Sequence, residues 1–185
     1  MTQPAGDQSP SLQHDCNACS GLCCVVLPFD AEQGFGFDKP AQTPCQHLRE
    51  DFLCGIHDAL EPNGFRGCIH FTCHGAGQRT TRLFGEANWR SSPAQASEVF
   101  NVFKRLQKLH ELQFLLQTAQ AKLDDAEWRG RLAAQQLSLE ALCIAVERHE
   151  WVDLEAATST TFALLRQLAT QPAIVALRNG QSPRD

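Results

Sequence analysis

The sequence lacks tyrosine, has methionine only at position 1, and contains no apolar run of the roughly 18–20 residues that a membrane helix needs. The missing run argues against a membrane-spanning helix. The opening stretch, MTQPAGDQSPSLQHD, has neither a basic start nor an apolar segment, so it does not predict a secretory signal. We therefore expect a cytoplasmic protein, in which thiols stay reduced.

Basic residues are scarce in the first part of the chain. Residues 1–77 carry three basic and nine acidic residues, and residues 78–185 carry thirteen basic and twelve acidic ones. Neither part is a basic patch, so we expect no nucleic-acid partner and no membrane partner. A bound cation would relieve the acidic excess, because each ligating thiolate adds a further negative charge.

Cysteine, in contrast, is abundant. The chain has nine, and only Cys143, in the apolar run ALCIAV, falls outside a dense cluster and is expected in a core. Clustered cysteines in a reducing compartment indicate metal binding more often than a disulfide framework or scattered buried thiols, which are the alternatives. The predicted metal ligands are Cys16, Cys19, Cys23, Cys24, Cys45, Cys54, Cys68 and Cys73.

The first four ligands lie in the run CNACSGLCC, spaced Cys-x2-Cys-x3-Cys-Cys. A Cys-x2-Cys pair can place two sulfurs around one metal, and Gly21 permits backbone N–H groups to point at sulfur. Adjacent side chains usually diverge, so we expect Cys23 and Cys24 to serve a cluster or two neighbouring metals rather than one ion.

The downstream cysteines are interleaved with histidines, of which His57, in Cys54-x2-His57, has the spacing of a ligand pair. A structural zinc takes four cysteine or histidine ligands, and iron–sulfur clusters prefer four cysteines. Eight cysteines therefore suffice for two clusters, for one cluster plus a zinc, or for a bridged polynuclear zinc site. The predicted cofactor is an iron–sulfur cluster, with zinc as the alternative. Copper is less favoured in a chain with one methionine.

The predicted domains are a flexible N-terminus (1–14), a cysteine-rich metal-binding module (15–90), a helical bundle (91–178) and a flexible tail (179–185). Within the module we expect a short strand at 24–29, brief helices at 46–52 and 56–61, and a hairpin or extended connector at 79–90. The module has many phenylalanines and few aliphatic residues. A hydrophobic core this small usually needs a disulfide or a bound metal to be stable.

Four helices are predicted after residue 90. The first begins at the N-cap Ser92 and carries an apolar stripe of Val99, Val102, Phe103, Leu106, Leu109, Leu116 and Leu123. The others span 124–136, a segment capped by Ser138, and 149–170. The predicted fold class is mainly α, with a small irregular cysteine-rich module packed on a C-terminal antiparallel helical bundle. The helical part is also the candidate surface for a protein partner.

The run CNACSGLCC resembles the signature of the bacterial zinc/iron-chelating domain family. That resemblance implies a metal centre, and a related signature in flagellin lysine methylases implies an iron–sulfur cluster. The stretches LCCVVLPF, PCQHLREDFLCGIH and GFRGCIHFTCHGAGQ, the pair Trp89-Arg90 and LHELQFLL resemble the N-terminal part of bacterial pentapeptide-repeat proteins. This chain has no pentapeptide repeats, so no role of such repeats is carried over. Neither resemblance brings a catalytic residue.

The favoured hypothesis is a cytoplasmic protein that binds metal ions in an iron–sulfur or polynuclear thiolate centre with a redox or electron-transfer role. Three alternatives stay open: a structural zinc module for protein interaction, an enzyme whose cluster assists reaction on a protein substrate, and metal storage or delivery.

Overall fold

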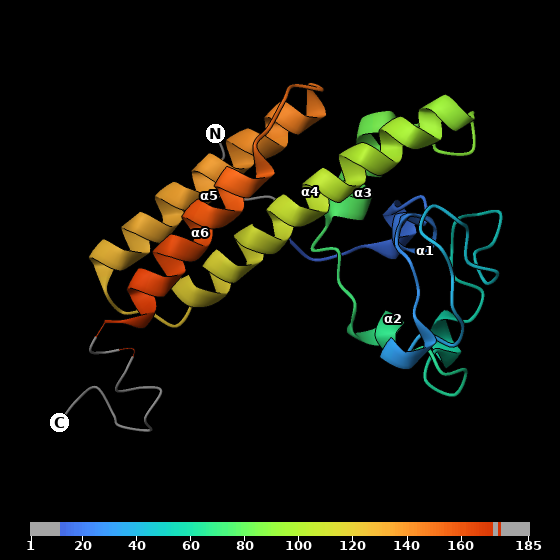
Figure 1. Ribbon diagram of the computed structural model, residues 1–185, viewed down its shortest axis with the longest axis horizontal. Helices are drawn as coiled ribbons and strands as arrows, with labels where there is room; N and C mark the ends of the chain where they lie inside the picture. Colours follow the sequence, from blue (N-terminus) through green and yellow to red (C-terminus); the bar gives the residue numbers. More distant parts are fainter. Residues whose placement is uncertain (1–11, 172–173, 175–185) are drawn as a thin grey trace, which may run out of the picture. The chain divides into compact units, whose positions relative to one another are not determined.

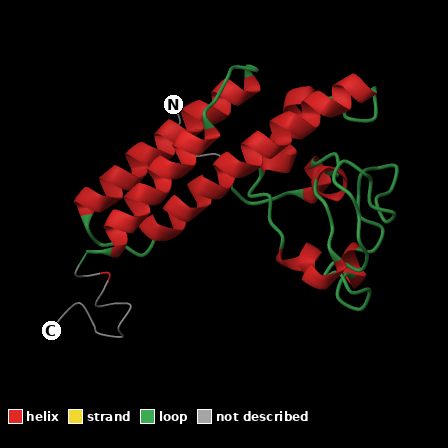
Figure 2. Cartoon of the chain, in the orientation of Figure 1, coloured by secondary structure: helices red, strands yellow, loops and turns green. Residues whose placement is uncertain are grey.

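The computed structural model describes residues 12–171 and residue 174 (Figure 1). The protein is mainly α-helical, as predicted, and the only β pairing among these residues is two isolated antiparallel bridges, Phe29 with Lys39 and Leu48 with Cys54 (Figure 2). The chain divides into two compact units, residues 1–110 and 111–185. Apart from residues 12–14, the two segments predicted to be flexible lie outside the described residues.

The first unit contains short helical segments joined by turns. In chain order they are η1 (Cys16–Ala18), α1 (Leu22–Val26), η2 (Ala31–Gln33), η3 (His57–Ala59), α2 (Arg66–His70) and α3 (Ala76–Phe84). They are followed by the first part of the long helix α4 (Pro93–Gln120), within which the two units divide.

The strand predicted at 24–29 is wrong, because residues 22–26 form α1. Gly21 precedes α1 with a left-handed φ of +69°, and this turns the chain into a helix. Leu22, Val25 and Val26 then share one buried face at helical spacing. The valines that suggested a strand are therefore buried by a helix, and only Phe29 is in β pairing.

Three further local predictions in this unit are wrong. Residues 46–52 form turns rather than a helix, and residues 56–61 contain only the single turn η3. The connector expected at 79–90 begins instead with α3, whose β-branched Thr80 and Thr81 donate their hydroxyls to carbonyls one turn earlier. These side-chain bonds let threonine occupy a helix interior.

Helix α4 begins as the sequence predicts. The Ser92 hydroxyl accepts a hydrogen bond from the Gln95 amide at 3.2 Å, and Pro93 is the first helical residue. Of the predicted stripe, Leu123 lies beyond the end of α4 and is half-buried. The others are all buried: Val99, Val102, Phe103, Leu106, Leu109 and Leu116.

The second unit holds the end of α4 and two long helices, α5 (Ala126–Glu147) and α6 (Leu154–Ala169). The break predicted before Ser138 is wrong, because the Ser138 hydroxyl donates to the carbonyl of Ala134 inside a continuous α5. Helix α6 begins at Leu154, after the N-cap Asp153, rather than at 149.

Helices α5 and α6 pack against each other in antiparallel directions (Figure 1). Side-chain hydrogen bonds join Gln135 to Thr161 at 3.1 Å and Arg131 to Gln167 at 2.7 Å. Cys143 is fully buried in α5, as predicted for a core cysteine. No helix in the described part of the chain has the length and apolar character needed to span a bilayer.

Candidate metal centre

All eight predicted cysteine ligands lie in the first unit, and all are free thiols. They come from segments far apart in the sequence: the N-terminal loop, α1, the turns between residues 45 and 54, α2 and the loop before α3. Cys16 is exposed, Cys45 is buried, and the other six are partly buried. The structure therefore places these thiols in a single unit at different depths.

The loop that carries Cys16 and Cys19 is held against the start of α3. Helix α3 packs on η1. The Asp15 amide donates to the Gln78 side-chain oxygen at 2.9 Å, and the Ser20 amide donates to the Thr81 hydroxyl at 2.9 Å. Cys73 lies just before α3, so these contacts bring it next to the first two cysteines.

Gly77, in the first turn of α3, lies where Cys19 and Cys73 approach each other. A Cβ atom at Gly77 would lie 2.8 Å from the Cys19 sulfur and 3.5 Å from the Cys73 sulfur. The first distance is far inside ordinary contact, so glycine is required for both sulfurs to lie over the same backbone position. A glycine inside a helix can indicate that another group packs closely against the backbone, but the sequence alone does not identify that group.

Cys23 is an electrostatic neighbour of all three of these thiols. Burial, together with the nearby Cys23, Cys19 and Cys73 thiols, raises the pKa of Cys16 to about 11. Burial also raises the pKa of Cys19 to about 11, against the lowering effect of backbone N–H groups. We name Cys16, Cys19, Cys23 and Cys73 the outer set.

Three of the remaining four cysteines lie in or against a phenylalanine core. Cys45 is buried with Phe29 and Phe65, and both Cys24 and Cys68 pack against this cluster. The Cys45 amide donates to the Cys24 carbonyl at 2.9 Å.

Cys54 belongs to the same group. It pairs with Leu48, three residues after Cys45, in one of the two β-bridges. Burial raises the pKa of Cys68 to about 12, with the thiols of Cys23, Cys45 and Cys54 as its charged neighbours. We name Cys24, Cys45, Cys54 and Cys68 the inner set.

The two sets meet at the adjacent residues Cys23 and Cys24. Their sulfur atoms lie 3.8 Å apart in the first turn of α1, so the expectation that these side chains diverge is wrong. Two thiolates bound at about 2.3 Å to one tetrahedral ion are also roughly 3.8 Å apart. The hydrogen bond with Cys24, followed by burial, raises the pKa of Cys23 well above its usual range.

Backbone N–H groups point at four of the sulfurs, those of Cys19, Cys23, Cys45 and Cys73. The His47 amide donates to the Cys45 sulfur at 3.4 Å. Burial raises the pKa of Cys73, and the N–H groups of Gly77 and Gly75 act against this rise, as those of Leu22 and Gly21 do for Cys19. Such bonds favour the thiolate over the thiol, and the thiolate is the form that binds a metal.

A lysine that sequence reasoning missed lies beside the thiols. Lys39 is 4% exposed, and its ammonium donates to the carbonyl oxygens of Leu27 at 2.5 Å and Pro40 at 3.2 Å. Burial lowers the pKa of Lys39, and the thiols of Cys45, Cys24 and Cys23 act in the opposite direction. This buried positive charge would offset part of the negative charge of a thiolate centre.

No three histidine, cysteine, aspartate or glutamate side chains in the described ranges are arranged as the ligands of one ion. The thiols are neighbours, but they are not drawn into a single compact shell. His57 has an exposed ring 3.5 Å from Asp58. The ring of His47 packs edge-on against Phe65, with ring centres 5.3 Å apart.

Sequence reasoning also gave no role to His110, which is 1% exposed on α4. Its Nδ1 lies 2.6 Å from the carbonyl of His74, which can only accept, so Nδ1 carries the proton. Arg79 lies 3.3 Å from the other ring nitrogen. These contacts hold the turn at His74 and Gly75, both with positive φ, that follows Cys73.

The Trp89-Arg90 pair joins the loops of both sets. The Trp89 indole N–H donates to the Ser20 carbonyl at 2.7 Å, between Cys19 and Cys23. The Arg90 guanidinium donates to the carbonyls of Glu50 at 2.6 Å and Arg49 at 2.9 Å, between Cys45 and Cys54.

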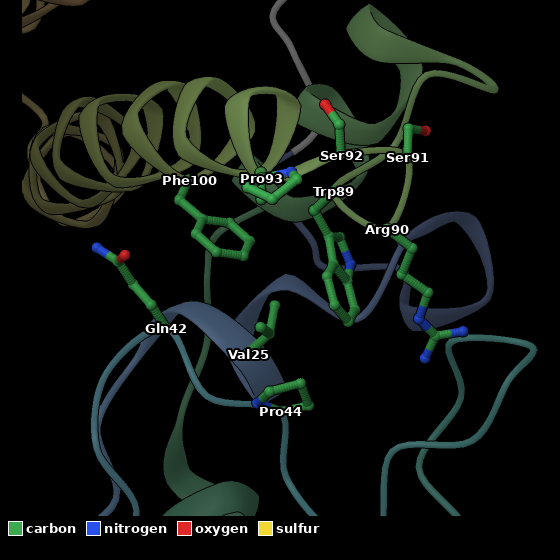
Figure 3. A pocket seen from close by; sticks show the side chains of 10 residues that line it. Val25, Gln42, Pro44, Trp89, Arg90, Ser91, Ser92, Pro93 and Phe100 are labelled. Carbon is green, nitrogen blue, oxygen red and sulfur yellow. The ribbon is translucent and has the colours of Figure 1, made fainter.

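A surface hollow of about 420 Å³ opens beside this pair. In Figure 3 the Trp89 ring lies between the Phe100 ring and the Arg90 side chain. Val25 and Pro44 also line the hollow. None of the eight cysteines lines it, so it is separate from the thiol groups.

No model of a protein family matches this chain, and no solved structure matches it. A protein of Bacillus subtilis (strain 168), named Uncharacterized protein YybG, is 44% identical over 109 residues, which make up 58% of this chain. The matched segment covers 39% of that protein's length. Its name states no activity or ligand, so the function of this chain is inferred from its own residues.

Proposed function

We propose that the first unit binds metal through its eight clustered thiolates, as an iron–sulfur or polynuclear thiolate centre of a cytoplasmic protein. The observation that carries this proposal is the presence of eight free cysteines, from five segments, in the first unit, with the sulfurs of the adjacent Cys23 and Cys24 3.8 Å apart. Eight reduced thiols in one small unit are far more than packing needs, whereas thiolate ligation uses every one of them.

The surroundings of the thiols support the proposal. Burial raises the pKa of Cys19, Cys45 and Cys73, and backbone N–H groups directed at these sulfurs act in the opposite direction, toward the deprotonated form. The ammonium of Lys39 places a positive charge beside the inner set. The resemblance of CNACSGLCC to chelating domains points in the same direction.

Bound metal also gives the unit a source of stability that its small core lacks. The segments before α4 are helices of at most nine residues, and a core of phenylalanine and cysteine holds them together. Metal binding to a site that exists only in the folded chain contributes directly to the free energy of unfolding. When bound, an iron–sulfur cluster would additionally store or pass an electron.

A polynuclear zinc centre is the second candidate. The separation of 3.8 Å between the Cys23 and Cys24 sulfurs equals the spacing of two thiolates on one tetrahedral zinc ion. In that case the centre has no redox role and serves to hold the unit in shape.

The test is purification of the full chain without oxygen, followed by elemental analysis and an absorption spectrum. An iron–sulfur centre gives a brown protein with stoichiometric iron and sulfide and a broad absorbance near about 400 nm. A colourless protein with stoichiometric zinc selects the second candidate. A metal-free protein with eight reactive thiols contradicts both.

A further inference from the structure

Helix α5 is apolar on both of its long sides. Its buried side carries Trp128, Leu132, Leu139, Cys143 and Val146. On the opposite side, small and aliphatic residues recur at steps of four and three residues, so they line one face of the helix. This apolar face consists of Gly130, Ala134, Leu137, Ala141 and Ile144, and all five are exposed. A helix that is apolar all round is normally buried on every side, so a partner is expected to cover this face.

The charged side chains of α5 are directed away from the apolar face. Between residues 130 and 146 the only charged residues are Arg131 and Glu140. Arg131 donates to the Gln167 side chain on α6 at 2.7 Å, and Glu140 accepts from the Gln113 side chain on α4 at 3.1 Å. Both charges are therefore used within the unit. Over roughly 25 Å of helix, the apolar face has none of the charges that usually cover a face in contact with water.

The largest side chains of this region are also among the most exposed apolar ones. Leu137 is 73% exposed, and Trp151, four residues beyond the end of α5, is 84% exposed. Single exposed apolar residues are ordinary, but a continuous row of them on one helix indicates an interaction surface.

The apolar face is complementary to itself when two copies of α5 run antiparallel. If Leu139 lies level with its counterpart, Leu137 falls opposite the second copy's Ala141, and Ile144 falls opposite its Ala134. Two-fold symmetry repeats both contacts in the other direction. Each large side chain thus meets a small one, which is the arrangement that lets two helices pack closely. A parallel pair would instead place Leu137 against Leu137 and Ala141 against Ala141.

The charges at the two ends of the apolar face select the same direction. Glu127 lies in the first turn of α5 and Arg148 is its C-cap residue, and both are exposed. In an antiparallel pair, Arg148 falls opposite the second copy's Gly130, one turn from its Glu127. A Cβ at Gly130 would meet nothing within 4 Å, so the long arginine side chain has room there. Opposite charges then meet at both ends, whereas a parallel pair would bring like charges together.

We propose that a second copy of this chain covers the apolar face, in a two-fold symmetric dimer with antiparallel α5 helices. The interface belongs to the second unit and contains none of the eight clustered thiols, so it does not depend on bound metal. A single pair of helices buries less than the roughly 1,600 Å² of a standard interface, and we therefore expect a dimer with a Kd on the order of 10 μM.

Analytical ultracentrifugation of the full chain, purified without oxygen, tests the dimer over a range of concentrations. We expect a reversible equilibrium between monomer and dimer that is the same before and after treatment with EDTA. A chain that stays monomeric up to about 200 μM, well above the expected Kd, overturns the proposal and leaves the apolar face to a different protein. Because the dimer is measured with and without metal, this outcome is distinct from failure of the proposed metal binding.

Leu137→Glu tests whether the dimer uses the apolar face. The substitution would place a carboxylate against the second copy's Ala141, so the dimer should weaken by about tenfold or more. Because Leu137 is exposed in the single chain, circular dichroism should show unchanged helix content. The matched control is Leu83→Glu on α3, the same change at a leucine that is 38% exposed. Equal dissociation in both variants and in the unmodified chain would place the interface elsewhere and overturn the proposal.

Charge reversal tests the direction of the helices. In the antiparallel dimer, Glu127→Arg or Arg148→Glu alone puts like charges together at both ends and should weaken the dimer by about three- to tenfold. The double variant restores opposite charges and should recover the original Kd. In a parallel dimer each single change merely exchanges one pair of like charges for another. Single variants with the original Kd, or a double variant weaker than both, contradict the antiparallel arrangement.

Discussion

The second unit buries aliphatic side chains along α5 and α6, whereas the first unit, before α4, consists of turns and helices of three to nine residues. Buried Leu132, Leu139 and Val146 recur at helical spacing in α5. In the first unit one buried cluster is Phe29, Cys45 and Phe65, surrounded by partly buried side chains, two of which are cysteines, and before α4 the aliphatic residues Leu22, Val25 and Val26 of the short helix α1 are buried as well.

This difference teaches that the two units draw on different sources of stability. A helix with a continuous apolar face is stabilised by burial of that face. Short segments with few aliphatic residues cannot offset the loss of chain entropy in this way and need a cross-link or a metal. The following predictions separate the two cases, beginning with the largest expected effect.

Complete metal removal should affect the first unit alone. Structural zinc in small domains contributes on the order of 10 kcal/mol, so residues 12–92 should lose most of their hydrogen-exchange protection without metal. The amides of α5 and α6 should keep theirs. Equal protection of both units before and after chelation would show that the first unit does not depend on metal.

Leu132→Ala should destabilise the second unit and leave the first unit unaffected. Leu132 is fully buried in α5, and removing its side chain should lower the stability of the second unit by about 2–5 kcal/mol. Chemical denaturation followed by helical circular dichroism measures this loss. The metal content per chain should be unchanged, and a lower metal content would show that the two units are coupled.

Gly77→Ala should weaken metal binding even though alanine favours helices. The added Cβ would lie 2.8 Å from the Cys19 sulfur, and disturbing the support of a ligand typically lowers metal affinity by about 10–100-fold. Competition with a chromogenic chelator measures the affinity. An unchanged affinity would show that Cys19 has room to move.

Arg90→Ala should separate the loops that carry the two sets. Its guanidinium donates to the carbonyls of Arg49 and Glu50 and lies 4.2 Å from the centre of the Phe52 ring. Loss of these contacts should cost about 1–2 kcal/mol in the first unit. The matched control is Arg82→Ala on the exposed face of α3, and an equal loss in both variants would rule out a specific role for Arg90.

Gly130→Ala should give the smallest effect and the opposite sign. Gly130 lies inside α5, and a Cβ there meets nothing within 4 Å. Alanine should therefore stabilise the second unit by about 0.5–1 kcal/mol, as measured by denaturation. The pair Gly77→Ala and Gly130→Ala thus applies the same chemical change to both units. A destabilised Gly130→Ala protein would contradict the open environment of that position.

The helical half of the fold was predictable from the sequence because helical periodicity is a local signal. The stripe along α4, apart from Leu123, and its N-cap Ser92 are confirmed. The errors lie where tertiary contacts decide, as in α1, where valines that favour strands are buried by a helix. Similarly, Ser138 looked like a cap but bonds back to Ala134 within α5.

The candidate ligands were recognisable from cysteine density, but their grouping was not. Cys73 is distant in sequence from Cys16, and only the packing of α3 on η1 brings them together. The roles of Lys39 and His110 could not be predicted from the sequence, because a lysine in a loop and a histidine in a helix are both common. The 3.8 Å contact of Cys23 with Cys24 depends on side-chain rotamers that the sequence does not specify.

Trp89 gives the first unit its own fluorophore. Its indole is hydrogen-bonded to the Ser20 carbonyl within the loop of the outer set, whereas the other two tryptophans, Trp128 and Trp151, belong to the second unit. Energy transfer to an iron–sulfur chromophore would quench the emission of Trp89, and spectroscopically silent zinc would not. With Trp128 and Trp151 replaced by phenylalanine, the emission of this single residue would report both the kind of metal bound and its departure.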